Sequence, residues 1–168
     1  DKRKKKMSKV YHGSIEEVRN PEIRQPNRSL DYGFGFYTTT SYEQAKKWVE
    51  RRMKDKGVAV GYINIYELDD NALKNMKSLF FEKTTEEWVN FVMRNRTDRQ
   101  FIHDYDVVYG PVANDSVYTQ FALYEGGIIS LPTLIKELKT YKLVDQYLFH
   151  TEKSLLAIKF VESEIIQL

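Results

Sequence analysis

Residues 33–40 read GFGFYTTT, and residues 41–50 follow at once as SYEQAKKWVE. The first stretch is rich in aromatic and β-branched residues, which is typical of a strand. A capping box at Ser41 predicts a helix that begins there and stops at Gly57. The paired glycines permit a tight backbone path into the strand, which then presents Tyr37. This strand–helix junction is the starting point for interpreting the rest of the chain.

Two interpretations of this junction remain open. The Gly33–Gly35 pair is not a dinucleotide-binding loop, because the third glycine and the strand–loop–helix context are missing. Tyr37 is either a core residue of a hairpin or a ring exposed to a ligand. Trp48 follows eleven residues later, about three helical turns, so it can return to the same side. The two aromatic side chains could sandwich a flat ring, or both could belong to the core.

Outward from this junction, strands and helices mix without strict βαβ alternation. This pattern predicts an α+β fold with a split, mostly antiparallel β-sheet and flanking helices. One domain over residues 7–168 is expected. Strands are predicted at 9–12, 34–40, 58–68, 78–82, 105–112, 144–150 and 159–168. Helices are predicted at 41–57, from Thr84, at 116–124, 131–143 and 151–158.

The composition excludes several classes of protein. The 168 residues contain no cysteine, so a disulfide framework, a thiolate zinc site and a cysteine nucleophile are ruled out. The three histidines, at 12, 103 and 150, lack paired spacing, and no metal site is predicted. No apolar run long enough for a transmembrane span is present, and the first residues have no signal-peptide core. We therefore expect a cytoplasmic protein that makes no use of a membrane.

The basic character of the chain comes from its first six residues. The whole sequence has 26 Lys+Arg against 24 Asp+Glu, but DKRKKK at residues 1–6 carries five of the basic residues and one acidic residue. The remainder is slightly acidic. We expect this tail to be a disordered segment or an expression remnant. The competing interpretation is a basic arm that touches nucleic acid.

Two further segments can carry chemistry. In YHGS, residues 11–14, the His12 ring could bond a ligand hydroxyl through an N–H group, and the Gly13 backbone could pair with a carboxamide. A turn with a surface histidine is the alternative. In DQYLFH, residues 145–150, Gln146 opens an otherwise apolar strand. It could reach into a cleft, or it could be the solvated start of the strand.

Together, YHGS, GFGFYTTT and DQYLFH resemble the motifs of the ADP-ribosyltransferase superfamily, the diphtheria-toxin-like and PARP-like group with a His-Tyr-Glu triad. Over nearly all of residues 8–165 the chain is more similar still to an uncharacterised bacterial family of that superfamily, a domain of unknown function. The resemblance implies a split-sheet fold that takes NAD⁺ as co-substrate. It also implies the catalytic residues His12, Tyr37 and Gln146.

Roles for other residues come from the same resemblance. His12 would bond the adenosine-side ribose, the Gly13 backbone would hold the nicotinamide carboxamide, and Tyr37 and Trp48 would stack on the nicotinamide ring. Further cofactor-binding candidates are Tyr11, Ser14, Arg28 and Thr38. Arg28 and Arg96 are candidates for the pyrophosphate, with surface ion pairing as the alternative. Asp31, Asp106 and Asp115 are candidate acids for activating an acceptor.

The chain departs from the superfamily at two positions. Ala45 stands where relatives have a serine that also holds the carboxamide. Gln146 occupies the position of the triad glutamate. Its amide oxygen can accept a hydrogen bond from a ribose hydroxyl, but an amide cannot act as a base. The resemblance therefore implies transfer of a single ADP-ribose to a macromolecular acceptor, protein or nucleic acid, by a toxin with a cognate antitoxin or by a phage-defence effector. The alternative is an inactive module that binds NAD or ADP-ribose.

Overall fold

The computed structural model describes residues 7–26 and 29–168. The basic tail and Arg28, two features singled out in the sequence, lie outside the described residues. Within the described part of the chain, no helix has the length and apolar character needed to cross a membrane.

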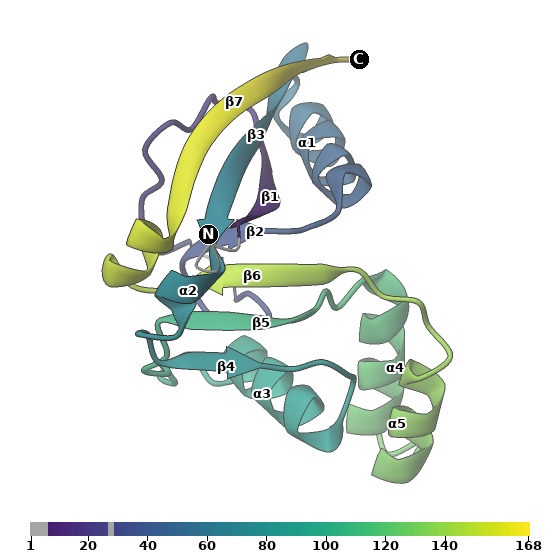
Figure 1. Ribbon diagram of the computed structural model, residues 1–168. Coiled ribbons are helices and arrows are strands. Elements are labelled where there is room, and N and C mark those ends of the chain that lie inside the picture. The colour runs from purple at the N-terminus through teal and green to yellow at the C-terminus, as the bar shows by residue number, and fades with distance from the viewer. Residues whose placement is uncertain (1–6, 27–28) are drawn as a thin grey trace.

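The upper sheet in Figure 1 contains three strands in the order β1-β3-β7, all antiparallel. These are β1 (Met7–Ser14), β3 (Val60–Asp69) and β7 (Ile158–Gln167). Helix α1 (Tyr42–Lys56) packs on β1 and β3. The helix residues buried by this packing are Ala45, Val49 and Met53.

The lower sheet contains four strands in the order β2-β6-β5-β4. These are β2 (Phe36–Thr38), β6 (Asp145–Phe149), β5 (Val107–Pro111) and β4 (Ser78–Phe80). The pairs β2–β6 and β5–β6 are antiparallel, and β4–β5 is parallel. The prediction of an α+β fold with a mostly antiparallel sheet is therefore confirmed.

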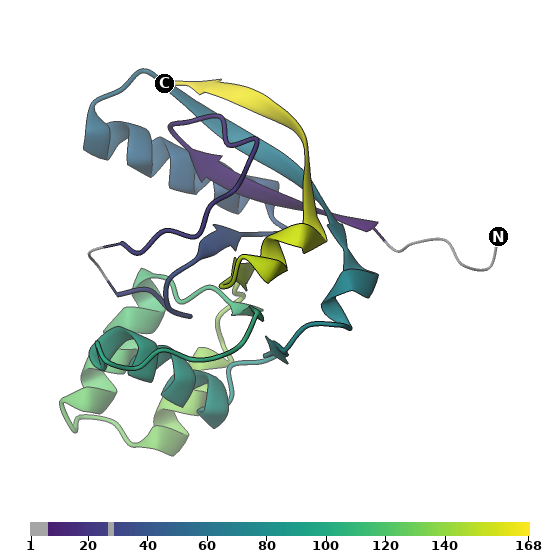
Figure 2. The same ribbon diagram turned by 90° about the vertical axis from the view of Figure 1, so that its left-hand side faces the viewer.

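Five short helical segments complete the fold. Three of them are α3 (Glu86–Thr97), α4 (Asp115–Glu125) and α5 (Leu131–Leu138), which supply most of the core beneath the lower sheet. Two small segments, α2 (Asp70–Leu73) and the 3₁₀ helix η1 (Lys153–Ala157), contact each other. Figure 2 shows α1 above and α3–α5 below on one side of the molecule, with the connection from β1 to β2 running between them.

The caps of α1 are those that the sequence predicts. Ser41 Oγ accepts a hydrogen bond from the Gln44 backbone N–H at 3.1 Å, and Gly57 ends the helix with φ of 66°. The cap of α3 is Thr85 and not Thr84 as predicted. Helix α2 was not predicted at all.

Helix α5 ends at Leu138, before the predicted end at residue 143. Thr140 Oγ1 donates to the Glu137 carbonyl at 2.7 Å. This hydrogen bond gives the Glu137 carbonyl a side-chain donor in place of a backbone N–H further along a helix. It therefore favours termination of the helix.

In the part of the chain that the structure describes, one backbone bridge joins the two sheets. The Tyr11 N–H donates to the Thr39 carbonyl at 2.8 Å, and the Thr39 N–H donates to the Tyr11 carbonyl at 2.9 Å. Beyond this bridge β1 continues along β3, while β2 continues along β6. The sheet is therefore split at the end of β1, where the sequence places YHGS.

Candidate functional site

The edge of β1 at the split carries the backbone N–H and C=O groups of Gly13. Tyr11 uses its N–H and C=O on Thr39, so these groups point away from β3. Paired and unpaired positions alternate along an antiparallel ladder, and Gly13, two residues on, points the same way. Among the described residues, no hydrogen-bond partner is found for either Gly13 group. One donor beside one acceptor matches the hydrogen-bonding pattern of a primary carboxamide.

The glycine at this position is required by α1. A Cβ added to Gly13 would lie 2.3 Å from the Ala45 carbonyl oxygen and 3.1 Å from the Val49 nitrogen, both backbone atoms. The helix therefore crosses β1 at a distance that only glycine allows. The sequence interpretation gave ligand approach as the reason for this glycine, whereas the structure shows close helix–strand packing.

The His12 ring lies at the same junction. Its Nδ1 is 2.6 Å from the Tyr37 carbonyl oxygen, and the ring stacks on Phe36 with centroids 4.2 Å apart. A carbonyl oxygen only accepts, so Nδ1 carries the hydrogen, and Nε2 of the neutral ring is an acceptor. Burial lowers the pKa of His12 to about 4. At neutral pH the ring can accept a hydrogen bond from a ligand hydroxyl through Nε2, instead of donating one as expected.

Gly13, Tyr37 and Gln146 lie on one face of the split sheet. Residues two apart on a strand share a face, and the bridge between β1 and β2 puts Gly13 and Tyr37 on the same side. Tyr37 lies opposite Leu148 on β6, and Gln146 is two residues before Leu148. This face is the one that α1 covers over the upper sheet and α3–α5 cover over the lower sheet.

Tyr37 is half-buried and holds the loop that precedes its own strand. Its hydroxyl donates to the Gly33 carbonyl at 2.5 Å and accepts from the Tyr32 backbone N–H at 3.0 Å. The pKa of Tyr37 is raised well above its usual value, first by burial and then by the negative charge of Asp31. The hydroxyl is therefore a neutral group that holds the loop, and the ring is not needed for that role.

Gln146 is 3% exposed and is not the solvated strand start that the sequence allowed. Its Nε2 donates to Asp31 Oδ2 at 3.0 Å and lies 3.4 Å from the Pro111 carbonyl oxygen. Both partners only accept, so the amide nitrogen must face them, and this chemistry fixes the orientation of the amide.

Asp31 is the one candidate acid that the structure brings to Gln146. Asp106 accepts from the Thr151 hydroxyl and the Lys77 backbone N–H, and Asp115 is exposed at the start of α4. Arg96 has its Nη1 at 3.4 Å from Asp31 Oδ1, as an ion pair. Arg96 therefore forms an ion pair, but with a buried carboxylate and not at the surface, and its role toward a pyrophosphate stays a prediction.

The remaining candidates lie around the split. The Ser14 hydroxyl accepts from the Glu16 N–H at 3.1 Å, in a local turn. The Tyr11 ring packs edge-to-face on Tyr42, with centroids 5.7 Å apart, so only the backbone of Tyr11 faces the split. Thr38 is fully buried, and its hydroxyl has no partner among the described residues. The Thr38 side chain points to the opposite face from Tyr37, so the two residues do not share one side of β2.

Trp48 lies on a different flank of α1 from Tyr42. Tyr42 reaches Glu164 on β7 through its hydroxyl, at 2.6 Å. Trp48 is six residues further on, about 120° around the helix axis, which turns it away from β7. It is half-buried, and no aromatic contact with Tyr37 is found in the described chain. The sandwich of a flat ring between Tyr37 and Trp48 therefore stays a prediction.

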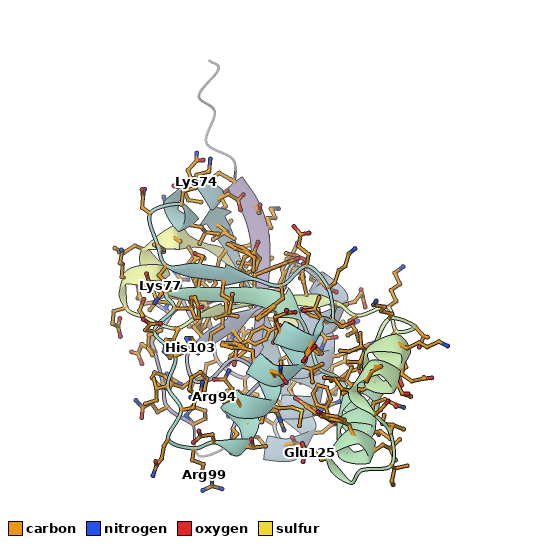
Figure 3. The ribbon with its side chains drawn as sticks, turned by 90° about the horizontal axis from the view of Figure 1, so that it is seen from below. Lys74, Lys77, Arg94, Arg99, His103 and Glu125 are labelled. Carbon is orange, nitrogen blue, oxygen red and sulfur yellow. The ribbon has the colours of Figure 1, made fainter. Side chains whose placement is uncertain are left out.

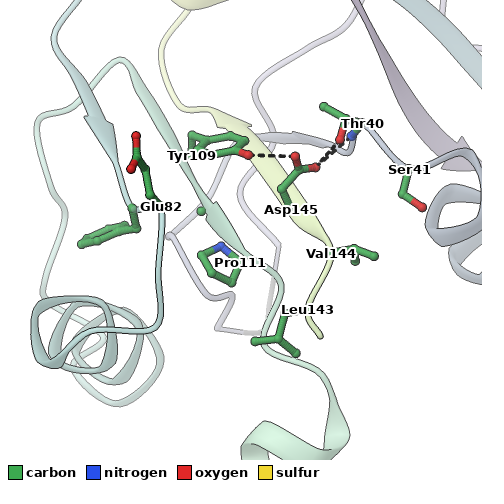
Figure 4. Close-up of a pocket in the computed structure, with 10 residues that line it drawn as sticks. Thr40, Ser41, Glu82, Tyr109, Pro111, Leu143, Val144 and Asp145 are labelled. Atoms are coloured by element: carbon green, nitrogen blue, oxygen red, sulfur yellow. Dashed lines mark hydrogen bonds between the residues drawn. The ribbon is translucent and has the colours of Figure 1, made fainter. Parts of the chain in front are cut away.

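A surface pocket of about 290 Å³ lies beside this region and not within it (Figure 4). Asp145 stands at its centre, accepting from the Tyr109 hydroxyl at 2.8 Å and the Thr40 hydroxyl at 2.6 Å. Asp145 and Gln146 are neighbours on β6, so their side chains point to opposite faces. The pocket is therefore separate from the face that carries Gly13, Tyr37 and Gln146.

A family model described as "Protein of unknown function (DUF3990)" matches residues 8–160 of the chain. The chain belongs to the DUF3990 family. The match includes β1 with His12 and Gly13, β2 with Tyr37, and β6 with Gln146, while most of β7 lies beyond its end at residue 160. Among the curated proteins, no match to the chain was found.

Two histidines of this DUF3990 chain were not identified as site residues from the sequence. His103 Nε2 bonds the Tyr32 carbonyl at 2.7 Å, and His150 Nδ1 bonds the Phe34 carbonyl at 2.7 Å. The two rings contact each other, with centroids 4.1 Å apart. Together, their hydrogen bonds to Tyr32 and Phe34 hold the loop that carries Asp31. Figure 3 shows His103 on the side of the molecule where Arg94 and Arg99 also lie.

Asn64 is a second group that the sequence did not reveal. It is fully buried on β3, where its Nδ2 donates to the carbonyls of His12 and Glu16 at 3.3 and 3.1 Å. Its Oδ1 accepts from the Val18 N–H at 2.9 Å. Asn64 thereby fixes the turn after β1 in the DUF3990 domain. An asparagine within a strand of alternating apolar residues was the available signal.

We expect the free energy of unfolding to fall as the pH drops from about 6.5 to about 4. Burial lowers the pKa of His103 from 6.5 to about 4, so in this window the unfolded chain binds the additional proton. At about 1.4 kcal/mol per pKa unit, His103 contributes up to about 3 kcal/mol at the acid end, and His12, with a pKa that is also lowered to about 4, adds to the loss. Urea unfolding of the parent across this range measures the loss.

The control for that prediction is His103→Gln, whose amide can donate to the Tyr32 carbonyl without titrating. Acidification should cost the variant less stability than the parent. Equal losses in both proteins would show that His103 is not the titrating group.

Proposed function

We propose that the chain is an NAD-dependent ADP-ribosyltransferase that transfers a single ADP-ribose to a macromolecular acceptor. The observation that carries this proposal is the Gly13 backbone pair at the split, which has no partner among residues 7–26 and 29–168 and lies on the same face as Tyr37 and Gln146. The order of the motifs along the chain, and their resemblance to the ADP-ribosyltransferase superfamily, give the same assignment.

The residues present suit NAD⁺ at four points. The Gly13 N–H and C=O fit the carboxamide, and the Tyr37 ring can stack on the nicotinamide from the lower sheet. Trp48 approaches from the flank of α1. The neutral His12 offers Nε2 to a ribose hydroxyl. His12 and Gly13 are neighbours on β1, so they face opposite sides of the sheet. A ligand that contacts both must therefore lie along the edge of the strand.

In the proposed reaction, the C1′–N1 bond of NAD⁺ breaks, and nicotinamide leaves with the bonding electron pair as a neutral molecule. The acceptor atom bonds to C1′ and loses one proton to solvent or a nearby base. Positive charge develops on the ribose as the bond breaks, as in glycoside hydrolysis. Gly13 and Tyr37 would hold the leaving group in place, while Gln146 would accept the ribose 2′-hydroxyl hydrogen bond.

Gln146 limits what the site can do. A glutamine lacks the negative charge of a glutamate. Without that charge the transition state is less stable by about 1–3 kcal/mol, which lowers the rate roughly 5- to 150-fold. An amide also cannot activate the hydroxyl of a growing polymer. Transfer of one ADP-ribose to an acceptor that needs no base at Gln146 is therefore the form of the reaction that we propose.

We further propose a cytoplasmic setting in which the chain acts as a bacterial toxin or phage-defence effector, with an antitoxin protein as partner. This setting rests on the resemblance alone.

The test of the proposed function is incubation of the protein with NAD⁺ labelled in the adenylate and with bacterial lysate. We expect release of nicotinamide and label on protein or nucleic acid. A Gln146→Ala variant should lower both by roughly 10-fold or more, because it loses the hydrogen bond to the 2′-hydroxyl. Lack of nicotinamide release and of NAD⁺ binding by a folded protein would contradict the proposal.

A second candidate function is a binding module for NAD⁺ or ADP-ribose without turnover. Gln146 is buried, and its amide N–H donates a hydrogen bond to Asp31 at 3.0 Å. Both features favour this alternative, because they restrain the side chain at the position that the superfamily uses for catalysis. In the same experiment, NAD⁺ binding without nicotinamide release, unchanged in Gln146→Ala, would support it.

A further inference from the structure

Asp31 is a buried carboxylate surrounded by donors. It is 7% exposed. Its Oδ2 accepts from Gln146 Nε2 at 3.0 Å and from the Ala113 N–H at 3.1 Å. Its Oδ1 accepts from the Tyr118 hydroxyl and from Arg96 Nη1 at 3.4 Å. Each of these groups donates, and the ionised carboxylate can accept all four bonds.

Asp31 determines how Gln146 presents its amide. The carboxylate and the Pro111 carbonyl both attract the amide nitrogen, at 3.0 and 3.4 Å. The oxygen of the same amide must then point away from them. In a free glutamine either end of the amide could face a ribose hydroxyl, whereas here the orientation is fixed before any ligand arrives.

The charge of Asp31 reaches the face that carries Tyr37. Its negative charge raises the pKa of Tyr37, as a cause secondary to burial, and also contributes to the raised pKa of Tyr118. Arg96 pairs with the opposite carboxylate oxygen from Gln146, and its side chain is 34% exposed. Water therefore screens the arginine more than the carboxylate, and the charge nearest to Gln146 is negative.

We propose that Asp31 is the positioning residue for Gln146, holding its amide oxygen toward the ribose and supplying the negative charge that a glutamine lacks. This inference rests on the proposed transferase function. Asp31 and Gln146 act in it as a carboxylate–amide pair that replaces one glutamate. The sequence separates them by 115 positions.

The test compares Asp31→Asn, Gln146→Glu and the double variant, with Asp55→Asn on the exposed end of α1 as the matched control. The measurements are kcat and KM for NAD⁺ by nicotinamide release, together with thermal unfolding of each protein. Asp31→Asn should lower kcat by roughly 10- to 100-fold with little change in KM, because the lost charge acts on the transition state. The double variant restores a carboxylate–amide pair but loses the present fit to the Ala113 N–H and the Pro111 carbonyl, so it should regain part of the lost kcat.

The Gln146→Glu variant tests the same coupling between Asp31 and position 146 if Asp31→Asn does not fold. Two carboxylates at this separation cannot both ionise freely, so one pKa must rise. We expect a pH dependence of kcat near neutrality that the parent lacks. A simple gain in kcat without that dependence would show that Asp31 is not coupled to position 146.

Two other outcomes overturn the inference. If folded Asp31→Asn retains the parent kcat, Asp31 only anchors its loop. If it loses activity and the double variant does not recover, the pair does not act as one unit. A folded parent that releases no nicotinamide defeats the proposed function itself, and the role of Asp31 with it.

Discussion

A Gly13→Ala protein is expected to lose about 3 kcal/mol or more of its free energy of unfolding, and roughly 6–12 °C in Tm. The new Cβ would lie 2.3 Å from the Ala45 carbonyl oxygen, a backbone atom of α1 that no side-chain rotation can move. The helix would have to shift away from β1 as a whole. Thermal unfolding measures the loss, and NAD⁺ binding should weaken with it because the Gly13 backbone pair moves.

Gly127→Ala is the matched control for Gly13→Ala. Gly127 has a φ of 74° but no atom within 4 Å of an added Cβ. Its substitution costs only the left-handed conformation, about 1 kcal/mol. Equal losses of unfolding free energy for the two variants would mean that the packing of α1 on β1 leaves room for a Cβ at position 13.

A Tyr37→Ala protein is expected to bind NAD⁺ roughly 5- to 150-fold more weakly, the value of about 1–3 kcal/mol for stacking on an aromatic side chain. The ring is half-buried at the split, and its hydroxyl is already held by Gly33 and Tyr32. The ring is therefore the proposed ligand contact, and the hydroxyl holds the loop. Isothermal titration with NAD⁺ measures the change.

Tyr37→Phe separates these two roles. It keeps the ring but removes the bonds to Gly33 and Tyr32, worth about 1 kcal/mol each. We expect NAD⁺ affinity within about 3-fold of the parent, alongside a lower Tm. If Phe weakened binding as much as Ala, the hydroxyl and not the ring would be the ligand contact.

The elements that could be predicted from the sequence are those with local signals. The cap at Ser41, the glycine stop at Gly57 and the repeat of buried residues in α1 depend on neighbours within a few positions. The apolar strands β3 and β6 were likewise predictable from alternation. Helix α2, four residues long, has too few residues to show a period.

The candidate site was only partly predictable, because its geometry depends on contacts between distant segments. The motifs located His12, Tyr37 and Gln146 by resemblance. Nothing near Gln146 in the sequence indicates that Asp31 would accept its amide, or that Gly13 would face the backbone of α1. The tautomer of His12 also depends on a carbonyl that lies 25 positions away.

The central claim, that the split beside Gly13 holds NAD⁺, is tested most directly by a crystal structure of the protein with NAD⁺ or a non-hydrolysable analogue. The account predicts the carboxamide on the Gly13 N–H and C=O, the nicotinamide ring against Tyr37, and the Gln146 amide oxygen within about 3.2 Å of the ribose 2′-hydroxyl. NAD⁺ in the pocket beside Asp145, or a Gln146 oxygen beyond hydrogen-bond reach of the ribose, would contradict it.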